Sequence, residues 1–389
     1  MASILPRIRN SAFARLVDRA AGSPLLWLMG AVRPKRPAPA AIRCAGIMMF
    51  ETIGDTLLAS ALIGSLRAND PELQITVFAS RGNVGVMPLI DGIHAVVEVP
   101  LTQPLRAVAA IRSAPVDVMI DIGQWPRWYA VLCALSRSRH TIGFATPGQW
   151  RHFAYDSPVA HRGDVHELEN FQRLLSPLGG VAPLPPVRAL KAVGEPPAAI
   201  AAKVPYVIVH PWASGFNHAA REWPVERWTA LIRRICATGR TVLITGGPAD
   251  QARSAELAAS CAGLSVESIA GTWSLPQLAA ILRHADAVVS VNTGIMHLAA
   301  ILDVPLVALH GPTSRRRWGP IGSRSMALAP PRGAQAEFLN LGFEYPSGVV
   351  DCMASISVDE VFGALHTQLA TAAAHGEGAS ARTGGVIPG

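Results

Sequence analysis

Two kinds of apolar pattern alternate along the chain. Short runs of apolar and β-branched residues, among them 42–50 and 116–122, are typical of buried strands. Longer segments with apolar residues at helical spacing separate them; in 52–70, for example, Leu58 and Leu62 share one face. Strands that alternate with helices predict parallel sheets built from βαβ units. The predicted fold class is therefore α/β.

The alternation occurs twice, and a proline-rich stretch separates the two occurrences. We predict an N-terminal Rossmann-like domain over 41–183, a linker over 184–203 and a C-terminal Rossmann-like domain over 204–374. A basic extension, 1–40, precedes them, and the low-complexity tail 375–389 is expected to be disordered. Two such domains facing each other would leave a central cleft at the carboxyl ends of their strands, where parallel sheets bind ligands.

Positive charge is concentrated in the N-terminal extension. Residues 1–40 carry seven basic residues against one acid, Asp18, and the net charge of the whole chain is +7. The rest of the chain is thus nearly neutral, and it has no basic domain with interleaved aromatic residues. Nucleic acid is therefore not an expected partner.

An apolar stretch, 23–32, lies within this basic extension. It is shorter than the roughly 18 residues needed to span a membrane, and Arg15, Arg19 and the basic segment 33–37 flank it. These charges favour a cytoplasmic protein whose extension rests on the anionic surface of a membrane, rather than a cleaved signal peptide. The alternative is a disordered extension without a role.

The five cysteines are scattered without the spacing of a metal site, and their number is odd. This pattern indicates unpaired thiols in a reducing compartment. Neither a metal site nor a cofactor is predicted.

The sequence ADAVVSVNTGIMHLAA, residues 285–300, predicts a strand that passes directly into a helix. Gly294 leaves room for a ligand beside the first amides of this helix, which lack intrahelical partners and carry the positive end of the helix dipole. A phosphate group suits such a position, and the Thr293 hydroxyl can add a hydrogen bond. The alternative is that Asn292 or Thr293 only caps the helix.

Other loops follow neighbouring strands and are expected at the same sheet edge. Arg221, just before a helix, can pair with phosphate oxygens, although a lone arginine is more often an ordinary surface charge. Asp250 can accept hydrogen bonds from ribose hydroxyls, or merely stabilise the helix that follows. The segment 310–320, with Gly311 and Thr313, follows the next strand.

Several of these segments together resemble a known family. The segments VNTGIMHLAAILDVPLVALHGPTSRRRWGP (291–320) and IGDTLLASALIGSLRANDPELQITVFAS (53–80) resemble signatures of glycosyltransferase family 9, the ADP-heptose:lipopolysaccharide heptosyltransferases. Three more segments, 210–232, 270–290 and 352–361, fit the same pattern in the same order, so the resemblance covers roughly residues 42–370. It implies the GT-B architecture, in which the second of two Rossmann-like domains binds most of the donor.

The resemblance also implies roles for individual residues. By this resemblance Asp55, after Gly54, corresponds to the family's general base in an inverting reaction that needs no metal. Taken alone, an acid at this position would be expected only to stabilise the start of a helix. The amides of Thr293, Gly294 and Ile295 would hold the leaving diphosphate. The other residues expected around the donor are Gly54, Arg221 where the family usually has lysine, Asp250 at the ribose, Gly311 and Thr313 in the pocket wall, and His297 packed beneath the site.

One position departs from the family pattern. The family generally has an aspartate where this chain has Asn292, and an amide keeps the size but loses the charge and adds a donor. Because of this difference, the resemblance does not determine which sugar the donor carries.

The implied function is transfer of a heptose, or a related sugar, from a nucleotide-diphosphate donor such as ADP-heptose to a lipopolysaccharide core-type acceptor. The alternatives are a family member that uses another nucleotide sugar for a different envelope glycan, and a catalytically degenerate nucleotide-sugar-binding protein. The acceptor is acidic, and the candidates to meet it are Arg81, Arg127, Arg139, Arg151 and Arg162. The extension would hold the enzyme at the inner membrane.

Overall fold

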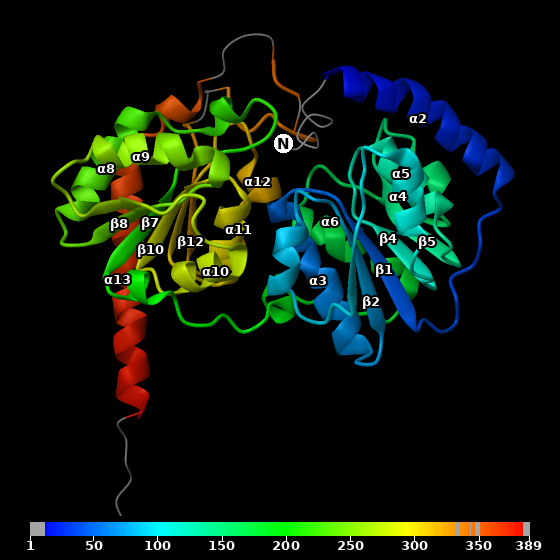
Figure 1. Ribbon diagram of the computed structural model, residues 1–389, viewed down its shortest axis with the longest axis horizontal. Coiled ribbons are helices and arrows are strands. Elements are labelled where there is room, and N and C mark those ends of the chain that lie inside the picture. The colour runs from blue at the N-terminus through cyan, green and yellow to red at the C-terminus, as the bar shows by residue number, and fades with distance from the viewer. Residues whose placement is uncertain (1–11, 332–334, 343, 347–350, 384–389) are drawn as a thin grey trace, which may run out of the picture. The chain divides into compact units, whose positions relative to one another are not determined.

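The computed structural model describes residues 12–331, 335–342, 344–346 and 351–383 (Figure 1). It divides into two compact units. Unit 1 contains Met1–Ala192 and Asn340–Phe343, and unit 2 contains Val193–Leu339 and Glu344–Gly389. The chain therefore leaves unit 1, contributes four residues to it again, and ends in unit 2.

Unit 1 is built on a six-stranded parallel sheet with the order β3-β2-β1-β4-β5-β6. The central strands are buried along almost their whole length, as expected for a parallel sheet with helices on both faces. The strands are β1 (Cys44–Met49), β2 (Gln74–Ala79), β3 (Ala95–Glu98), β4 (Val118–Asp121), β5 (His140–Ala145) and β6 (Ser157–Ala160).

The helices of unit 1 differ in how deeply they are buried. Helix α3 (Ile53–Asn69) is buried from Gly54 to Leu66 because it packs between the sheet, helix α6 (Glu167–Arg173) and the short helix η4 (Pro186–Ala189). Helices α4 (Pro104–Ile111) and α5 (Arg127–Leu135) bury one face each. The short helices η1 (Val84–Leu89), η2 (Arg151–Ala154) and η3 (Ser176–Leu178) complete the unit.

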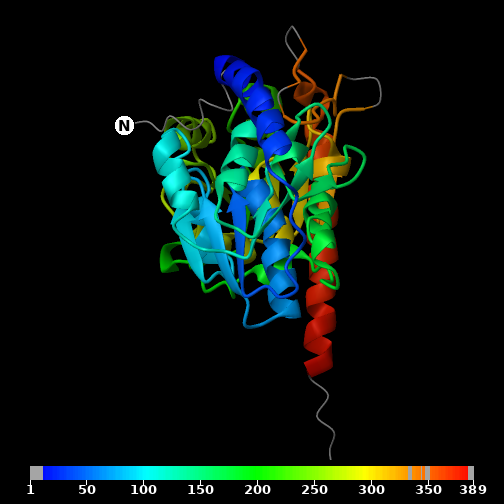
Figure 2. The same ribbon diagram turned by 90° about the vertical axis from the view of Figure 1, so that its right-hand side faces the viewer.

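Part of the basic extension is a helix, α2 (Ala12–Val32), which packs on α5 and η2 (Figure 2). Asp18 fixes its first half, because its carboxylate accepts hydrogen bonds from the backbone amides of Arg127 and Trp128. Arg33, just after the helix, pairs with the buried Asp156 at 3.2 Å.

Unit 2 repeats the strand order of unit 1. Its sheet has the order β12-β11-β10-β7-β8-β9, which read from β9 is again 3-2-1-4-5-6 in order of appearance, the order of the Rossmann fold. The strands are β7 (Tyr206–His210), β8 (Thr241–Ile244), β9 (Val266–Ser268), β10 (Ala287–Val291), β11 (Leu306–Leu309) and β12 (Ser325–Leu328).

The core of unit 2 lies between this sheet and its amphipathic helices. Trp223 and Trp228 meet edge to face with their ring centroids 5.1 Å apart, and the last helix, α13 (Val358–Thr383), adds Val361 and Leu365 to the same core. The remaining helices are α7 (Ala198–Ala201), η5 (His218–Arg221), α8 (Val225–Cys236), η6 (Pro248–Asp250), α9 (Gln251–Ala259), α10 (Leu275–Arg283), α11 (Gly294–Ile301), α12 (Arg315–Trp318) and η7 (Met353–Ser355).

Some boundaries differ from those that the sequence predicts. Helix α6 ends at Arg173, and Gly179 and Gly180 follow η3 with φ of 63° and 72°, a conformation that favours glycine. The proline-rich segment 184–191 packs against α3 through η4 and so belongs to unit 1. Helix α13 continues into the stretch 375–389, of which 384–389 lies outside the described residues.

Candidate active site

Both sheets bring their candidate residues to the position where such folds bind ligands. In a 3-2-1-4-5-6 sheet the strand order reverses between the first and fourth strands, and the loops after these strands diverge to leave a crevice. In unit 1 these strands are β1 and β4, and Asp55 follows β1. In unit 2 they are β7 and β10, and Arg221 and Asn292 follow them.

The turn after β10 passes directly into α11, as the sequence predicts. Thr293 is the N-cap residue in extended conformation, with φ −148° and ψ 177°, but its side chain does not bond to the first turn. Its Oγ1 is buried and has no hydrogen-bond partner among the described atoms. The amides that open α11, at Gly294, Ile295 and Met296, are thus not capped by this hydroxyl, which is itself left available to a ligand.

The Asn292 side chain connects this turn to the loop after β11. Its Nδ2 donates to Thr313 Oγ1 at 2.9 Å and lies 3.2 Å from His310 Nδ1. Strands β10 and β11 are neighbours with Val291 opposite Leu309, and this pairing sets Asn292 beside His310. With Asn292 donating, Nδ1 of His310 is the acceptor. An aspartate here could only accept, so Thr313 and His310 would both have to donate.

His297 lies one turn into α11 and is 4 % exposed, so it packs beneath the turn. Gly311, after β11, packs closely against η7 and the residue before it, because a Cβ on it would lie within about 3 Å of the Met353 and Cys352 side chains. A larger residue there would make these side chains move.

Arg221 and Asp250 are both engaged by protein groups. Arg221 Nη2 donates to the carbonyl of Ser214. The Asp250 carboxylate accepts from the Gly247 amide at 2.7 Å and from Arg253 Nη2 at 2.6 Å. Arg253 also bonds to both carboxylate oxygens of Glu222. The sequence does not predict Arg253, although its position three residues after Asp250 on a helix is a spacing at which ion pairs form.

His210, the last residue of β7, contributes a neutral group to this edge of the sheet. Its Nδ1 lies 2.9 Å from Thr245 Oγ1. Burial lowers the pKa of His210 to about 4, with Asp250 raising it and Arg253 lowering it further.

In unit 1, Asp55 lies in the first turn of α3 and is 8 % exposed. The Thr52 hydroxyl donates to Asp55 Oδ2 at 2.7 Å and accepts from the Asp55 amide at 3.4 Å. Gly54, beside it, is buried. Asp55 therefore has the position of a helix-start acid, and the hydroxyl fixes its carboxylate at the carboxyl edge of the sheet.

A buried cluster that the sequence does not predict lies at the end of β4. Asp121 Oδ2 accepts from Arg151 Nη2 at 2.6 Å and from the Tyr155 hydroxyl at 2.7 Å, and all three side chains are almost fully buried. Burial alone would lower the pKa of Arg151, but Tyr155 and Asp121 raise it above its ordinary value. The signal in the sequence is Asp121, an acid near the end of the apolar run 116–122.

The five arginines proposed to meet the acceptor differ in position. Arg151 is enclosed in the cluster just described, and Arg127 is buried in an ion pair with Asp18. Arg139 precedes β5 and pairs with Asp117, so it lies at the amino edge of the sheet, away from the loops of the site. Arg81 and Arg162 follow β2 and β6 at the carboxyl edge and are exposed, and Arg162 pairs with Asp164.

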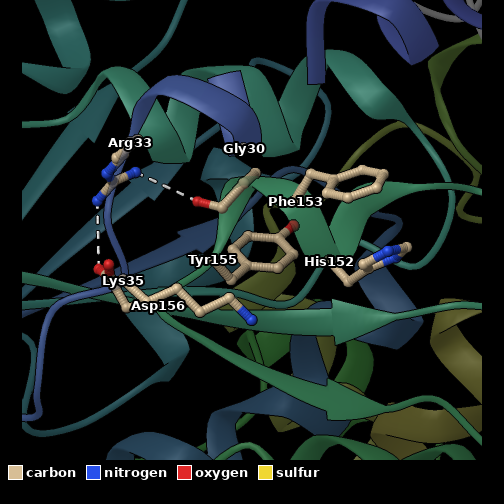
Figure 3. Close-up of a pocket in the computed structure, with 8 residues that line it drawn as sticks. Gly30, Arg33, Lys35, His152, Phe153, Tyr155 and Asp156 are labelled. Carbon is tan, nitrogen blue, oxygen red and sulfur yellow. Dashed lines mark hydrogen bonds and ion pairs between the residues drawn. The ribbon is translucent and has the colours of Figure 1, made fainter. Parts of the chain in front are cut away.

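Unit 1 contains cavities in its described part, and the two described next are not lined by a predicted site residue. One lies between the end of α2 and the segment 152–156 and has a volume of about 240 Å³ (Figure 3). The other is lined by residues of α3 and η4, among them Arg67 and Ala189. Among the described residues no group of histidine, cysteine and acidic side chains has the arrangement of a metal site.

Two solved structures that share this architecture are E. coli heptosyltransferases. ADP-heptose LPS heptosyltransferase II of E. coli matches with a TM-score of 0.67 and 18 % identity, covering 84 % of this chain and 98 % of that one. The E. coli heptosyltransferase WaaC with ADP matches with a TM-score of 0.66 and 19 % identity, over 84 % and 99 % of the two chains. These matches confirm the predicted α/β fold of the GT-B type.

A family model named glycosyltransferase family 9 (heptosyltransferase) matches residues 110–341, more than half of the chain. The chain belongs to this family and is a glycosyltransferase. A similar relative is lipopolysaccharide heptosyltransferase 3 of Escherichia coli, 25 % identical over 294 residues, which are 69 % of this chain and 83 % of that protein. Lipopolysaccharide heptosyltransferase 1 of Salmonella typhimurium is 37 % identical over 121 residues, 30 % and 37 % of the two chains.

Proposed function

We propose that the chain transfers a heptose from ADP-heptose to an acceptor of the lipopolysaccharide core type, with inversion at the anomeric carbon and without a metal ion. The observation that carries the proposal is the match to the heptosyltransferase family model over 110–341, which includes the turn at Asn292–Gly294. The geometry of that turn supports it, since uncapped helix amides at a sheet edge suit a diphosphate.

In the proposed reaction an acceptor hydroxyl attacks the anomeric carbon as the bond to the diphosphate breaks, and ADP leaves. Asp55 takes the hydroxyl proton. The amides at Thr293, Gly294 and Ile295 stabilise the growing negative charge of the leaving diphosphate, and Arg221 turns from Ser214 to add its positive charge. The Thr293 hydroxyl, buried without a partner among the described atoms, supplies a further hydrogen bond.

Asp250 contacts the ribose through the lone pairs that Gly247 and Arg253 leave unused, since an ionised carboxylate has about four acceptor sites. Asn292 and Thr313 face the donor sugar together, because their mutual hydrogen bond fixes both side chains. His297 packs beneath the site, and Gly311 contributes with Thr313 to the pocket wall.

The chain works at the cytoplasmic surface of the inner membrane, where a lipid-linked acceptor is found, and its basic extension 1–40 contributes to this placement. Among the described residues no helix is long and apolar enough to cross a membrane.

The test is transfer of labelled ADP-heptose to truncated lipopolysaccharide core acceptors by the purified full-length chain. Formation of a heptosylated core with release of ADP is the expected result, in buffer with and without a chelator. Binding of ADP-heptose without turnover on any core acceptor would instead assign the chain to nucleotide-sugar binding alone.

A second candidate function is transfer of another sugar to a different envelope glycan. It is favoured by Asn292, whose amide donates to Thr313 where the resembling enzymes have a carboxylate. A thermal-shift panel of ADP-, GDP- and UDP-sugars, run on the natural chain and on Asn292→Asp, separates the two. A response to a different sugar, lost in Asn292→Asp, would favour this second function.

A further inference from the structure

Helix α2 turns a continuous apolar face to solvent, whereas Asp18, Gly22 and Leu26 lie against the protein. On an ordinary surface helix the apolar stripe faces the core. At 3.6 residues per turn, the outward face of α2 spans an arc of about 120°. This face holds no charged or polar residue, and it consists of Phe13, Leu16, Val17, Ala20, Pro24, Trp27, Leu28 and Ala31.

The large side chains of this face are well exposed. Phe13 is 74 % exposed, Leu16 62 %, Trp27 57 % and Leu28 53 %. Val32 and Leu25, at the margin of the face, are exposed as well. A contiguous apolar surface of this kind marks a site of interaction.

The opposite face is fastened to unit 1, so α2 cannot rotate to hide the apolar residues. Asp18 pairs with Arg127 at 3.3 Å, and Leu26 is fully buried. Gly22 and Gly30 allow the close approach, because a Cβ on Gly22 would meet Arg127 and one on Gly30 would meet Phe153, each within 3 Å.

Basic residues lie near the two ends of α2. In its first half Arg19 is exposed and Arg15 is half-buried on the side away from the apolar face, and Lys35 follows the end of the helix. The cavity beside the last turn is lined by Arg33, Lys35 and His152 (Figure 3), and Lys35 together with burial lowers the pKa of His152. Arg33 pairs with Asp156, whereas the ammonium of Lys35 has no acidic partner among the described residues. An apolar face with cations near its two ends is complementary to an anionic lipid surface.

We propose that the outward face of α2 inserts into the surface of an anionic lipid bilayer, with Arg15, Arg19 and Lys35 at the level of the phosphate groups. The helix then lies in the plane of the membrane, and Trp27 sits at the boundary between acyl chains and headgroups, where indole rings are favoured. The proposal rests on the membrane location given under the proposed function, but it does not depend on the sugar that is transferred.

The test is co-sedimentation of the full-length chain with phosphatidylcholine vesicles that contain or lack phosphatidylglycerol. We expect binding to the anionic vesicles. The triple variant Leu16→Gln/Trp27→Gln/Leu28→Gln should bind them at least about tenfold more weakly, because it removes three large apolar side chains from the lipid.

A matched control replaces three exposed valines elsewhere, Val96→Gln/Val187→Gln/Val225→Gln, whose exposed fractions lie between 41 % and 51 %. It should bind like the natural chain. A second variant, Arg15→Gln/Arg19→Gln, should lose part of the preference for anionic lipid and keep the apolar contribution.

Equal vesicle binding by the triple variant and the natural chain would overturn the proposal. So would a dimer in lipid-free buffer that the triple variant dissociates, since the face would then serve a second copy of the chain. Transfer to a soluble truncated acceptor, measured in parallel, should be unchanged in the triple variant. If the natural chain binds anionic vesicles but transfers no sugar, the proposed reaction is wrong, while the proposed membrane contact still holds.

Discussion

The Asp55 carboxylate accepts a hydrogen bond from the Thr52 hydroxyl and lies at the start of a helix. A carboxylate fixed in this way can serve the helix, the reaction or both. Replacing it by the isosteric amide separates these roles, since the amide keeps the shape and loses the ability to accept a proton.

We expect Asp55→Asn to lower the rate of heptose transfer by about 100-fold to 10,000-fold, the usual contribution of a general base. Binding of ADP, followed by thermal shift, should be retained. The control is Asp70→Asn at the other end of α3, where the carboxylate accepts a hydrogen bond from a local amide, that of Glu72. Transfer by Asp55→Asn at the rate of this control would remove Asp55 from the mechanism.

His210 makes the stability of unit 2 depend on pH. Its pKa in the folded protein, about 4, lies below the ordinary value of 6.5. Between these values the unfolded chain binds the proton and the folded chain does not. The free energy of unfolding therefore falls as the pH is lowered from 6.5 towards 4, by roughly 3 kcal/mol for this group.

Urea unfolding at a series of pH values measures this dependence. In His210→Asn, which keeps a polar amide near Thr245, the free energy of unfolding should no longer fall by this amount between pH 6.5 and 4. In His218→Asn, at an exposed histidine, the fall should remain. Parallel profiles for the natural chain and His210→Asn would show that the buried imidazole does not titrate as expected.

The sequence predicts those parts of the site that lie in one continuous segment. The strand, the glycine and the helix start around Gly294 are all visible in a run of 16 residues, 285–300. The hydrogen bonds from Asn292 to Thr313 and His310 follow once β10 and β11 are recognised as neighbours. The bonds from Arg253 to Glu222 and the contacts of the Asp121 cluster could not be predicted, because they depend on side-chain packing between separate segments of the chain.

At the level of elements, the cluster of Asp121, Arg151 and Tyr155 depends on a glycine in strand β5. Gly143 leaves the space that the Tyr155 ring occupies, since a Cβ on Gly143 would lie only 2.3–2.7 Å from atoms of that ring. The ring is fully buried and cannot move aside without disturbing the two hydrogen bonds of its hydroxyl.

We expect Gly143→Ala to destabilise unit 1 by about 1–3 kcal/mol, the range for overpacked cores. Gly194→Ala is the control, because no atom lies within 4 Å of a Cβ there and its φ is not in the left-handed region. Thermal unfolding of the two variants measures the difference. Equal midpoints would mean that the ring adjusts without cost.

The elements that the sequence does not reveal are short or lie at the surface. Strand β6 is four residues long and contains Pro158, and strand β12 is only half-buried. Both are edge strands, where proline and weak apolar patterns are tolerated. Helix α2 is not predicted as a helix from the sequence. Its apolar stretch contains Pro24 and indicates a membrane-associated segment, but it does not indicate a particular conformation.

At the level of the whole molecule, the same strand order occurs in both units, so each has a position where ligands are expected. The proposed donor site lies in unit 2. ADP at about 100 times its dissociation constant should therefore stabilise this unit by about 2.7 kcal/mol.

Hydrogen exchange locates this effect. ADP should slow exchange at the amides of 293–296 and in the loop 211–221, both at the carboxyl edge of the sheet. The turn 237–240 precedes β8 at the amino edge and should exchange at an unchanged rate. Protection of 237–240 without protection of 293–296 would place the nucleotide elsewhere.

Helix α13 has a consequence for how the chain is made. It packs on β10, β11, β12 and α8, and its Val361, Ala364 and Leu365 belong to the same core as the central strands of unit 2. These residues are synthesised after all six strands of the second sheet. One face of that sheet therefore stays uncovered until α13 has been made, and a premature stop before residue 358 would release a chain with exposed core residues, which chaperones and proteases recognise.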